Sequence, residues 1–281
     1  MNFLEALFAT PLLLLALLAA IGASVASGII GSYVVVKRTV SISGSIAHSV
    51  LSGLGCALWL QYRYHIEWLS PIYGALVAAI ISALIIGWVH LYYQEREDAI
   101  IAMIWSVGMA VGVIFSSQIP GFNVDLMNFL LGNVLWIQPV DLGLLAVIDF
   151  VIIATVLIFH KQFVALCFDP KQAKLQGVHV GPLYLLLLVL IALSVVLLIH
   201  IVGVILVLSM LALPASIAST FTYRLSHMMV IAIILNIVFS IGGFAISYRL
   251  DWPAGSTIAL FSGLIYVLSL RFKKPTSSPT P

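Results

Sequence analysis

The feature that most constrains the fold of this chain is a series of long apolar stretches that follow one another along nearly its whole length. A helix needs about 20 mostly apolar residues to cross the hydrocarbon core of a bilayer. We therefore predict an all-α integral membrane protein with about nine transmembrane helices. The predicted spans are residues 11–36, 42–60, 71–92, 98–117, 140–159, 183–200, 203–221, 228–247 and 255–270.

The number of spans depends on the apolar run at residues 184–221. One very long helix here would leave eight spans. We divide the run at Gly203, because Pro214 and a chain reversal near Gly203 fit two helices better than one. The first apolar run does not have the pattern of a cleaved signal peptide, since it is preceded by Glu5 and by no Lys or Arg, and it is too long.

Composition excludes several other classes of protein. Charged residues make up 8% of the chain and hydrophobic residues 63%, whereas soluble domains carry roughly 25% charged residues. Such a chain cannot cover a soluble globule with polar surface, and disorder requires the opposite composition. A net charge of +2 predicts no nucleic-acid partner. Two cysteines, Cys56 and Cys167, are too few for a disulfide framework or a Cys-rich zinc site.

Basic residues indicate the direction of the spans. Cytoplasmic loops of membrane proteins carry an excess of Lys and Arg. With nine spans and the N-terminus outside, only Arg63 and Arg249 fall outside the cell. We predict a multi-pass protein of the cell (inner) membrane with a cytoplasmic C-terminus, formed by one transmembrane domain over 1–273 and a disordered tail over 274–281. The basic residues placed in the cytoplasm are Lys37, Arg38, Arg96, Lys161, Lys171, Lys174, Arg224, Arg271, Lys273 and Lys274.

The usual catalytic motifs are absent from the sequence. It contains no G-x-x-x-x-G-K-[ST] phosphate loop, no H-E-x-x-H zinc motif and no G-x-S-x-G nucleophile elbow. We therefore predict no catalytic residue and no tightly bound cofactor. If nucleotide powers a transport step, a separate subunit must hydrolyse the ATP.

The second span carries a polar stripe, SISGSIAHSVLSGLG from 41 to 55. Ser41, Ser45, His48 and Ser52 follow one another at i, i+4, i+7 and i+11, so they share one helical face. Such a face is costly against acyl chains and is expected to line a protein interface or an aqueous path. The alternative is that the hydroxyls and His48 only satisfy packing.

His48 is the candidate metal ligand of this stripe. Neutral imidazole binds zinc, manganese or iron at cytoplasmic pH, and a transporter needs contacts that release their cargo. If two copies of the chain pack about a two-fold axis, each axial residue appears twice. Two His48 side chains would then act as transient ligands.

Asp149 is the one acid deep inside a predicted span. A carboxylate there must be paired, protonated or hydrated, so it is a second, weaker candidate for an ion path, with a hydrogen-bonded packing role as the alternative. We expect Asn236 to bond neighbouring helices. The other histidines lie in loops or near span ends, where we expect His65, His160, His179 and His227 to be solvated and His90 and His200 to pack or extend toward the interface.

The loop at residues 160–182 is amphipathic and ends in a Gly-Pro pair. One interpretation is a helix that lies on the lipid headgroups. The other is a short helix, about 163–177, that docks into a groove on a soluble partner. Cytoplasmic placement favours docking to a cytoplasmic subunit.

Six stretches together resemble the metal-ion permease family of ABC-type transporters, which serves zinc, manganese and iron(II) uptake. They occur in order over about residues 10–270. The stretches are VVVKRTVSISGSIAHSVLSG (34–53), EDAIIAMIWSVGMAVGVIFSS (97–117), DLMNFLLGNVL (125–135), FDPKQAKLQGV (168–178), VGVILVLSMLALPASIA (202–218) and LDWPAGSTIALFSGLIYVL (250–268).

The resemblance implies the permease fold, a second permease copy (a homodimer or a close paralogue), cytoplasmic ATPase subunits and an extracytoplasmic metal-binding protein. It implies ATP-driven import of a divalent metal ion by alternating access. It also implies that 168–178 contains the coupling helix that engages the ATPase. The matched coupling positions are Phe168, Asp169, Pro170, Ala173 and Gly177.

One position departs from the family pattern. His48 matches the histidine of the family's Asp-x-x-x-His pattern, but Gly44 occupies the acid position. Oxygen ligands favour manganese, while imidazole suits zinc and iron. The departure therefore favours zinc over manganese and iron as the transported ion.

Three acids fall on the predicted outer face: Glu67, Asp125 and Asp251. They could contact the binding protein or the ion, although exposed acids are common in loops. Three other functions stay open at this stage. They are a permease for a metal chelate such as a siderophore or cobalamin, an intramembrane enzyme, and a channel that works without ATP.

Overall fold

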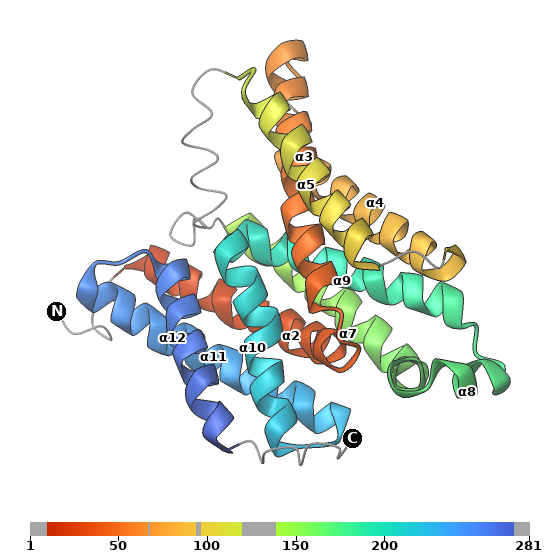
Figure 1. Cartoon of the computed structure of the whole chain (residues 1–281). Coiled ribbons are helices and arrows are strands. Elements are labelled where there is room, and N and C mark those ends of the chain that lie inside the picture. Colours follow the sequence, from red (N-terminus) through yellow and green to blue (C-terminus); the bar gives the residue numbers. More distant parts are fainter. Residues whose placement is uncertain (1–9, 67, 94–96, 120–138, 273–281) are drawn as a thin grey trace.

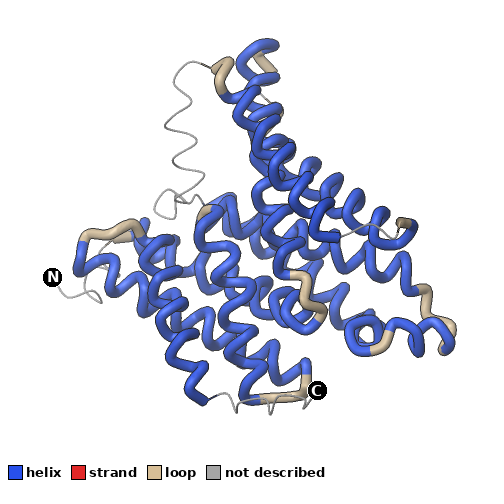
Figure 2. Tube along the Cα trace, viewed as in Figure 1, coloured by secondary structure: helices blue, strands red, loops and turns tan. Residues whose placement is uncertain are grey.

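The computed structural model describes residues 10–66, 68–93, 97–119 and 139–272, and these ranges contain helices but no strand. The helices cross one another in a single bundle, from which α3, α4 and α5 extend together (Figures 1 and 2). Their bounds are α2 Pro11–Val36, α3 Val40–Tyr64, α4 Pro71–Tyr92, α5 Glu97–Ser116, α7 Pro139–Phe168, α8 Pro170–Leu175, α9 Val180–Val202, α10 Val204–Phe221, α11 Leu225–Leu250 and α12 Ala254–Ser269, followed by a 3₁₀ turn at Leu270–Phe272.

The described helices confirm an all-α membrane protein. Eight of them are long and apolar enough to cross a bilayer, and the ninth, α12, has 16 residues and is shorter. The run at 184–221 is divided at Gly203, as predicted. Gly203 ends α9 and precedes α10 with φ at +82°, a backbone conformation that a side chain disfavours. The chain changes direction there and α10 leaves the line of α9 (Figure 1).

Small residues bring the helices of this bundle close together. α3 crosses α4 where Gly53 faces Gly74, and a Cβ on either glycine would overlap the carbonyl oxygen of the other. α3 also packs along α5, where Gly108 lies against the Ser49 backbone. Lipid supplies no hydrophobic drive for helix association, so close van der Waals packing and hydrogen bonds between helices hold such a bundle together.

α2 lies against α7, α9, α10 and α11, and Asn236 of α11 links three of these helices. Pro214 lies inside α10 and has no N–H, so the Met210 carbonyl four residues earlier loses its helical donor. Asn236 Nδ2 donates to that carbonyl at 3.1 Å and to Ser27 Oγ of α2 at 3.0 Å. The fully buried amide therefore replaces the missing bond and joins α2, α10 and α11, as expected for Asn236.

We predict that Asn236→Leu destabilises the protein by about 1–2 kcal/mol, because it leaves the Met210 carbonyl buried without a donor. Thermal unfolding in detergent measures the change. The matched background is Pro214→Ala, which restores the N–H that Met210 lacks. Asn236→Leu should lower the stability to unfolding less in the Pro214→Ala protein than in the unmodified one. An equal loss of stability in the two proteins would contradict the role given to the Asn236–Met210 hydrogen bond.

Candidate functional site

The candidate site is the exposed edge of α3 where it runs beside α5. His48 lies about a third of the way along α3 and is half-buried. The indole of Trp105 in α5 stacks on its ring, with 4.4 Å between ring centroids and 9° between ring planes. Trp105 itself is 41% exposed. Among the described residues, the His48 ring is held on one face by this stacking and makes no hydrogen bond.

The serines of the predicted stripe differ in their surroundings. Ser41 is exposed, and Ser52 is half-buried and donates to the Ser49 carbonyl of its own helix at 2.7 Å. Ser45 is fully buried and donates to the Ile101 carbonyl of α5 at 2.9 Å. The Ser45 hydroxyl therefore joins α3 to α5. We define the α3 seam as Ser41, His48 and Ser52, the polar residues of this stripe that keep accessible surface.

Gly44 lies one turn before His48, at the position where the family pattern has an acid. Gly44 is buried, and a Cβ built on it would meet the Leu208 side chain of α10 at 3.5 Å, an ordinary contact. The backbone there has room for a Cβ without strain. The packing of α3 against α10 therefore does not by itself require glycine here.

The structure does not bring Asp149 together with the α3 seam. Asp149 lies on α7, which packs on α2 and α9, whereas α3 packs mainly on α4 and α5. Its side chain is 8% exposed, and Oδ1 has no hydrogen-bond partner among the described residues. No cluster of three or more His, Cys, Asp or Glu side chains occurs in the part of the chain that the structure describes. A closed metal cage is therefore absent from the described part of a single chain.

The segment at 163–177 forms two helices instead of one. Phe163–Phe168 is the last part of α7, and α8 begins at Pro170. Proline cannot continue a helix, and it restricts the residue before it. Asp169 is accordingly non-helical, with φ −147° and ψ 87°, and its carboxylate caps α8 by accepting from the Gln172 backbone N–H at 2.9 Å. The predicted bounds of this helix were too long, because Asp-Pro divides it.

α8 ends in a Schellman motif and exposes Leu175 beside the polar side chains of Lys171, Gln172 and Lys174. The Val178 N–H donates to the Ala173 carbonyl, and the Gly177 N–H donates to the Lys174 carbonyl, with Gly177 at φ +82°. Ala173 is buried against the bundle. Leu175 and Phe168 point away from it, with exposed fractions of 88% and 63%. α8 is therefore a short helix, capped at both ends, on which Leu175 has no cover from the described part of the chain.

Of the three predicted outer acids, Asp251 lies within the described residues. It is exposed and ends α11 in a left-handed conformation, with φ at 55°. Glu67 and Asp125 lie outside the described residues, as does the tail at 274–281.

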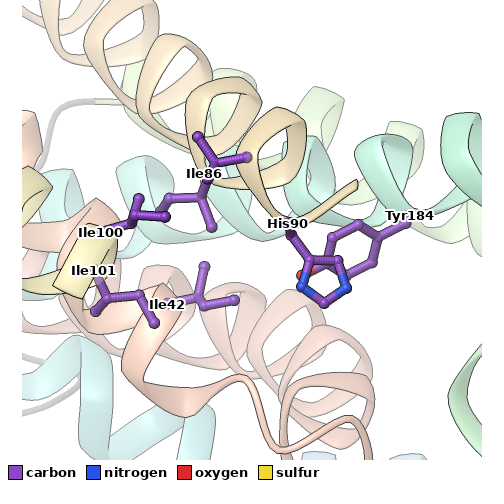
Figure 3. Close-up of a pocket in the computed structure, with 7 residues that line it drawn as sticks. Ile42, Ile86, His90, Ile100, Ile101 and Tyr184 are labelled. Atoms are coloured by element: carbon purple, nitrogen blue, oxygen red, sulfur yellow. The ribbon is translucent and has the colours of Figure 1, made fainter. Parts of the chain in front are cut away.

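A small cavity lies where α3, α4, α5 and α9 meet (Figure 3). Its walls are mostly isoleucine side chains, and the rings of His90 and Tyr184 lie against each other at one edge, with 4.6 Å between centroids. The cavity encloses about 10 Å³, close to the least volume that holds one water molecule. It is too small and too apolar to be the path of a hydrated ion.

Comparison with known proteins decides the family. The family model described as the ABC 3 transport family matches residues 9–273. The chain belongs to this family. It is therefore a permease of an ABC-type metal transporter and a multi-pass membrane protein, as the resemblance implied.

Individual relatives support the family assignment along the whole permease. A protein of Chlamydia trachomatis named "Probable metal transport system membrane protein" is 55% identical over 96% of this chain and 92% of its own length. The "Manganese transport system membrane protein MntC" of Listeria monocytogenes is 31% identical over 97% of this chain and 94% of its own. PsaBC from Streptococcus pneumoniae, solved in complex with a Fab, contains a chain with 28% identity and a TM-score of 0.84, over 95% and 94% of the two chains.

Two residues of the permease were missed or misplaced by sequence reasoning. Trp105 was inside a matched stretch but was not singled out. The sequence could have indicated it, because tryptophans of membrane proteins concentrate at the two interfaces, whereas Trp105 lies near the middle of α5. His160 was expected to be solvated, but its ring lies within hydrogen-bonding distance of Tyr33 and Ser226. That contact could not be predicted, since it joins helices far apart in the sequence.

Proposed function

We propose that this permease carries a divalent first-row transition-metal ion into the cell, as the membrane subunit of an ATP-driven importer that contains two permease copies. The observation that carries the proposal is the half-buried imidazole of His48, held by Trp105 on the accessible edge of α3. A polar edge inside an apolar span is costly toward lipid. A second copy against this edge would shield it and would enclose a central path.

In the dimer, the seam serves as a transient binding surface. Two His48 rings about the two-fold axis supply two nitrogen ligands, and the hydroxyls of Ser41 and Ser52 supply weaker oxygen contacts. Two strong ligands and several weak ones bind an ion without trapping it. A metal chelate would need a wide path with no ligand at its centre, so the single imidazole per chain favours a bare ion. Asp149 stays a weaker candidate for an ion-path role.

Energy for transport enters through α8, which we propose is the coupling helix. Its cap at Asp169 and its Gly177 ending fix its geometry, and the exposed Phe168 and Leu175 provide an apolar anchor for a cytoplasmic ATPase. Closure of the ATPase pair on ATP binding would displace α8 and shift the bundle between outward-facing and inward-facing states. This placement puts the α8 end in the cytoplasm and Asp251 on the face that meets an extracytoplasmic metal-binding protein.

Two observations bear on the identity of the ion. Gly44 in place of an acid favours zinc on ligand chemistry. Several relatives, among them that of Listeria monocytogenes, are named for manganese transport, and this favours manganese. We infer that both ions enter the seam and that the absence of a carboxylate at position 44 affects the preference between them.

We predict that Gly44→Asp raises the ratio of manganese to zinc uptake, because it adds an oxygen ligand one turn from His48. The measurement is ATP-dependent uptake of manganese, zinc and iron(II) by proteoliposomes that contain the permease, its ATPase and its binding protein. Gly44→Asn is the matched control, since it has the same size without the charge. Uptake of a siderophore but of no free ion by the unmodified complex would reject the proposed function.

A further inference from the structure

The C-terminal part of α7 is held by polar contacts with α2 and α11. The helix has 30 residues, so it is about 45 Å long, while the hydrocarbon core is about 30 Å thick. The excess length leaves room for the residues from about His160 to Phe168 to lie at or beyond one membrane surface. This segment leads directly into α8, with Asp169 as the only residue between the two helices.

Three polar contacts hold this segment. Tyr33 Oη of α2 lies 3.1 Å from His160 Nδ1, and Ser226 Oγ of α11 lies 3.2 Å from His160 Nε2. Lys37 Nζ, at the end of α2, donates to the Leu166 carbonyl of α7 at 3.2 Å. We call these five residues the α7 anchor.

The hydrogen-bond donors and acceptors of the α7 anchor are complementary. A neutral imidazole has one donor and one acceptor nitrogen, and a hydroxyl can take either complementary role, so both His160 bonds form together. The Leu166 carbonyl is in the last turn of α7, where carbonyls lack helical donors and the helix dipole favours a cation. The Lys37 ammonium supplies both the donor and the charge.

Aromatic rings pack against the same residues. Tyr33 is fully buried, and its ring meets that of Phe163 edge-on with 5.5 Å between centroids. The Lys37 ammonium lies 6.0 Å from the centroid of the Tyr184 ring of α9. The end of α7 is therefore fixed to the end of α2 by both a dry aromatic contact and a charged hydrogen bond.

From α2, direct contacts continue toward the α3 seam. Gly31, half a turn from Tyr33, packs on the Leu211 backbone of α10. The side chain of Leu208, about one turn earlier in α10, lies beside Gly44 in α3. These contacts form a continuous packed series from the α7 anchor to the helix that carries His48.

We propose that Tyr33, Lys37 and His160 are positioning residues for coupled transport, which transmit the displacement of α8 through α7 to α2 and so to the α3 seam. The proposal rests on the proposed function, since it takes α8 as the helix that the ATPase moves. The three residues touch neither the ion nor the nucleotide. Substitution of these residues is expected to allow ATP hydrolysis without metal movement. Binding of the ATPase and of the second permease copy should not change.

The test compares metal uptake per ATP hydrolysed in proteoliposomes that contain the full complex. Tyr33→Phe removes one hydroxyl and keeps the ring on Phe163, and Lys37→Met removes the charge and keeps the length. We expect each to lower the uptake-to-hydrolysis ratio by about fivefold with unchanged copurification of the ATPase. Lys37→Arg keeps the charge and the hydrogen-bond donors, so it should keep the ratio of the unmodified complex. Thr155→Val is the matched control, because Thr155 is a polar residue of α7 that bonds only to its own helix, at the Val151 carbonyl.

The outcomes separate this proposal from the proposed function. A ratio equal to that of the unmodified complex in both Tyr33→Phe and Lys37→Met would overturn the positioning role. So would a parallel loss of assembly, hydrolysis and uptake, which indicates that the α7 anchor serves only stability. If the unmodified complex itself moves no metal ion, the proposed function fails first.

Discussion

Replacing His48 with alanine is expected to lower metal uptake by about 10- to 100-fold, the range seen when groups that orient a metal ligand are removed. His48 would supply the strongest ligand of the α3 seam, and no carboxylate stands at Gly44 to replace it. The measurement is the initial rate of manganese and zinc uptake by the reconstituted complex at limiting metal concentration. ATPase binding should not change, because α8 packs on α7 and α9, whereas His48 and Trp105 lie on α3 and α5.

The control for this change is His227→Ala. His227 is exposed at the beginning of α11, and its loss should leave uptake unchanged. Trp105→Leu is a second, graded variant. It removes the stacking partner of His48 but keeps the imidazole. Its metal uptake should therefore lie between that of His48→Ala and that of His227→Ala. Unchanged uptake in His48→Ala would show that the ion does not meet this imidazole.

Leu175→Asp is expected to weaken binding of the ATPase by about 2 kcal/mol, or roughly thirtyfold. Leu175 is 88% exposed on α8, so the aspartate costs the free permease little. In the complex, the carboxylate would be buried against an apolar pocket of the partner. The measurement is copurification of the ATPase with the permease, followed by uptake at excess ATPase.

Leu175→Met is the matched variant, since it keeps an apolar side chain of similar volume. It should bind the ATPase nearly as well as the unmodified permease. If Leu175→Asp binds the ATPase as tightly as Leu175→Met, α8 is not the docking element, and the alternative of a helix on the lipid headgroups gains support.

Most of the fold was predictable because membrane helices are specified locally. Apolar length gave the spans, and the positive φ of Gly203 explains why the longest run divides there. The ends of the helices were harder to predict. α7 continues from the predicted end at 159 to Phe168, since its last turns are amphipathic and are held by Tyr33 and Lys37, which no local pattern reveals.

The candidate site was predicted only in part, because helical periodicity does not say which neighbour covers a face. Ser45 and His48 belong to one stripe, yet Ser45 is buried against Ile101 of α5 and His48 keeps accessible surface. The stacking of Trp105 and the bridge made by His160 are tertiary contacts between distant segments. Leu175 is part of the amphipathic loop that the sequence showed. Its exposure on a separate short helix depends on the end of α7 at Asp169–Pro170.

The most direct test of the α3 seam is its accessibility to water in the assembled transporter. Ser52→Cys, made after Cys56 and Cys167 are replaced by serine, places one thiol on the seam. We predict that a charged, membrane-impermeant thiol reagent modifies Cys at this position in at least one nucleotide state and that manganese or zinc slows the modification. Reaction only with a membrane-permeant reagent, at the same rate in every nucleotide state and with or without metal, would show that the seam faces lipid and would contradict the proposed path.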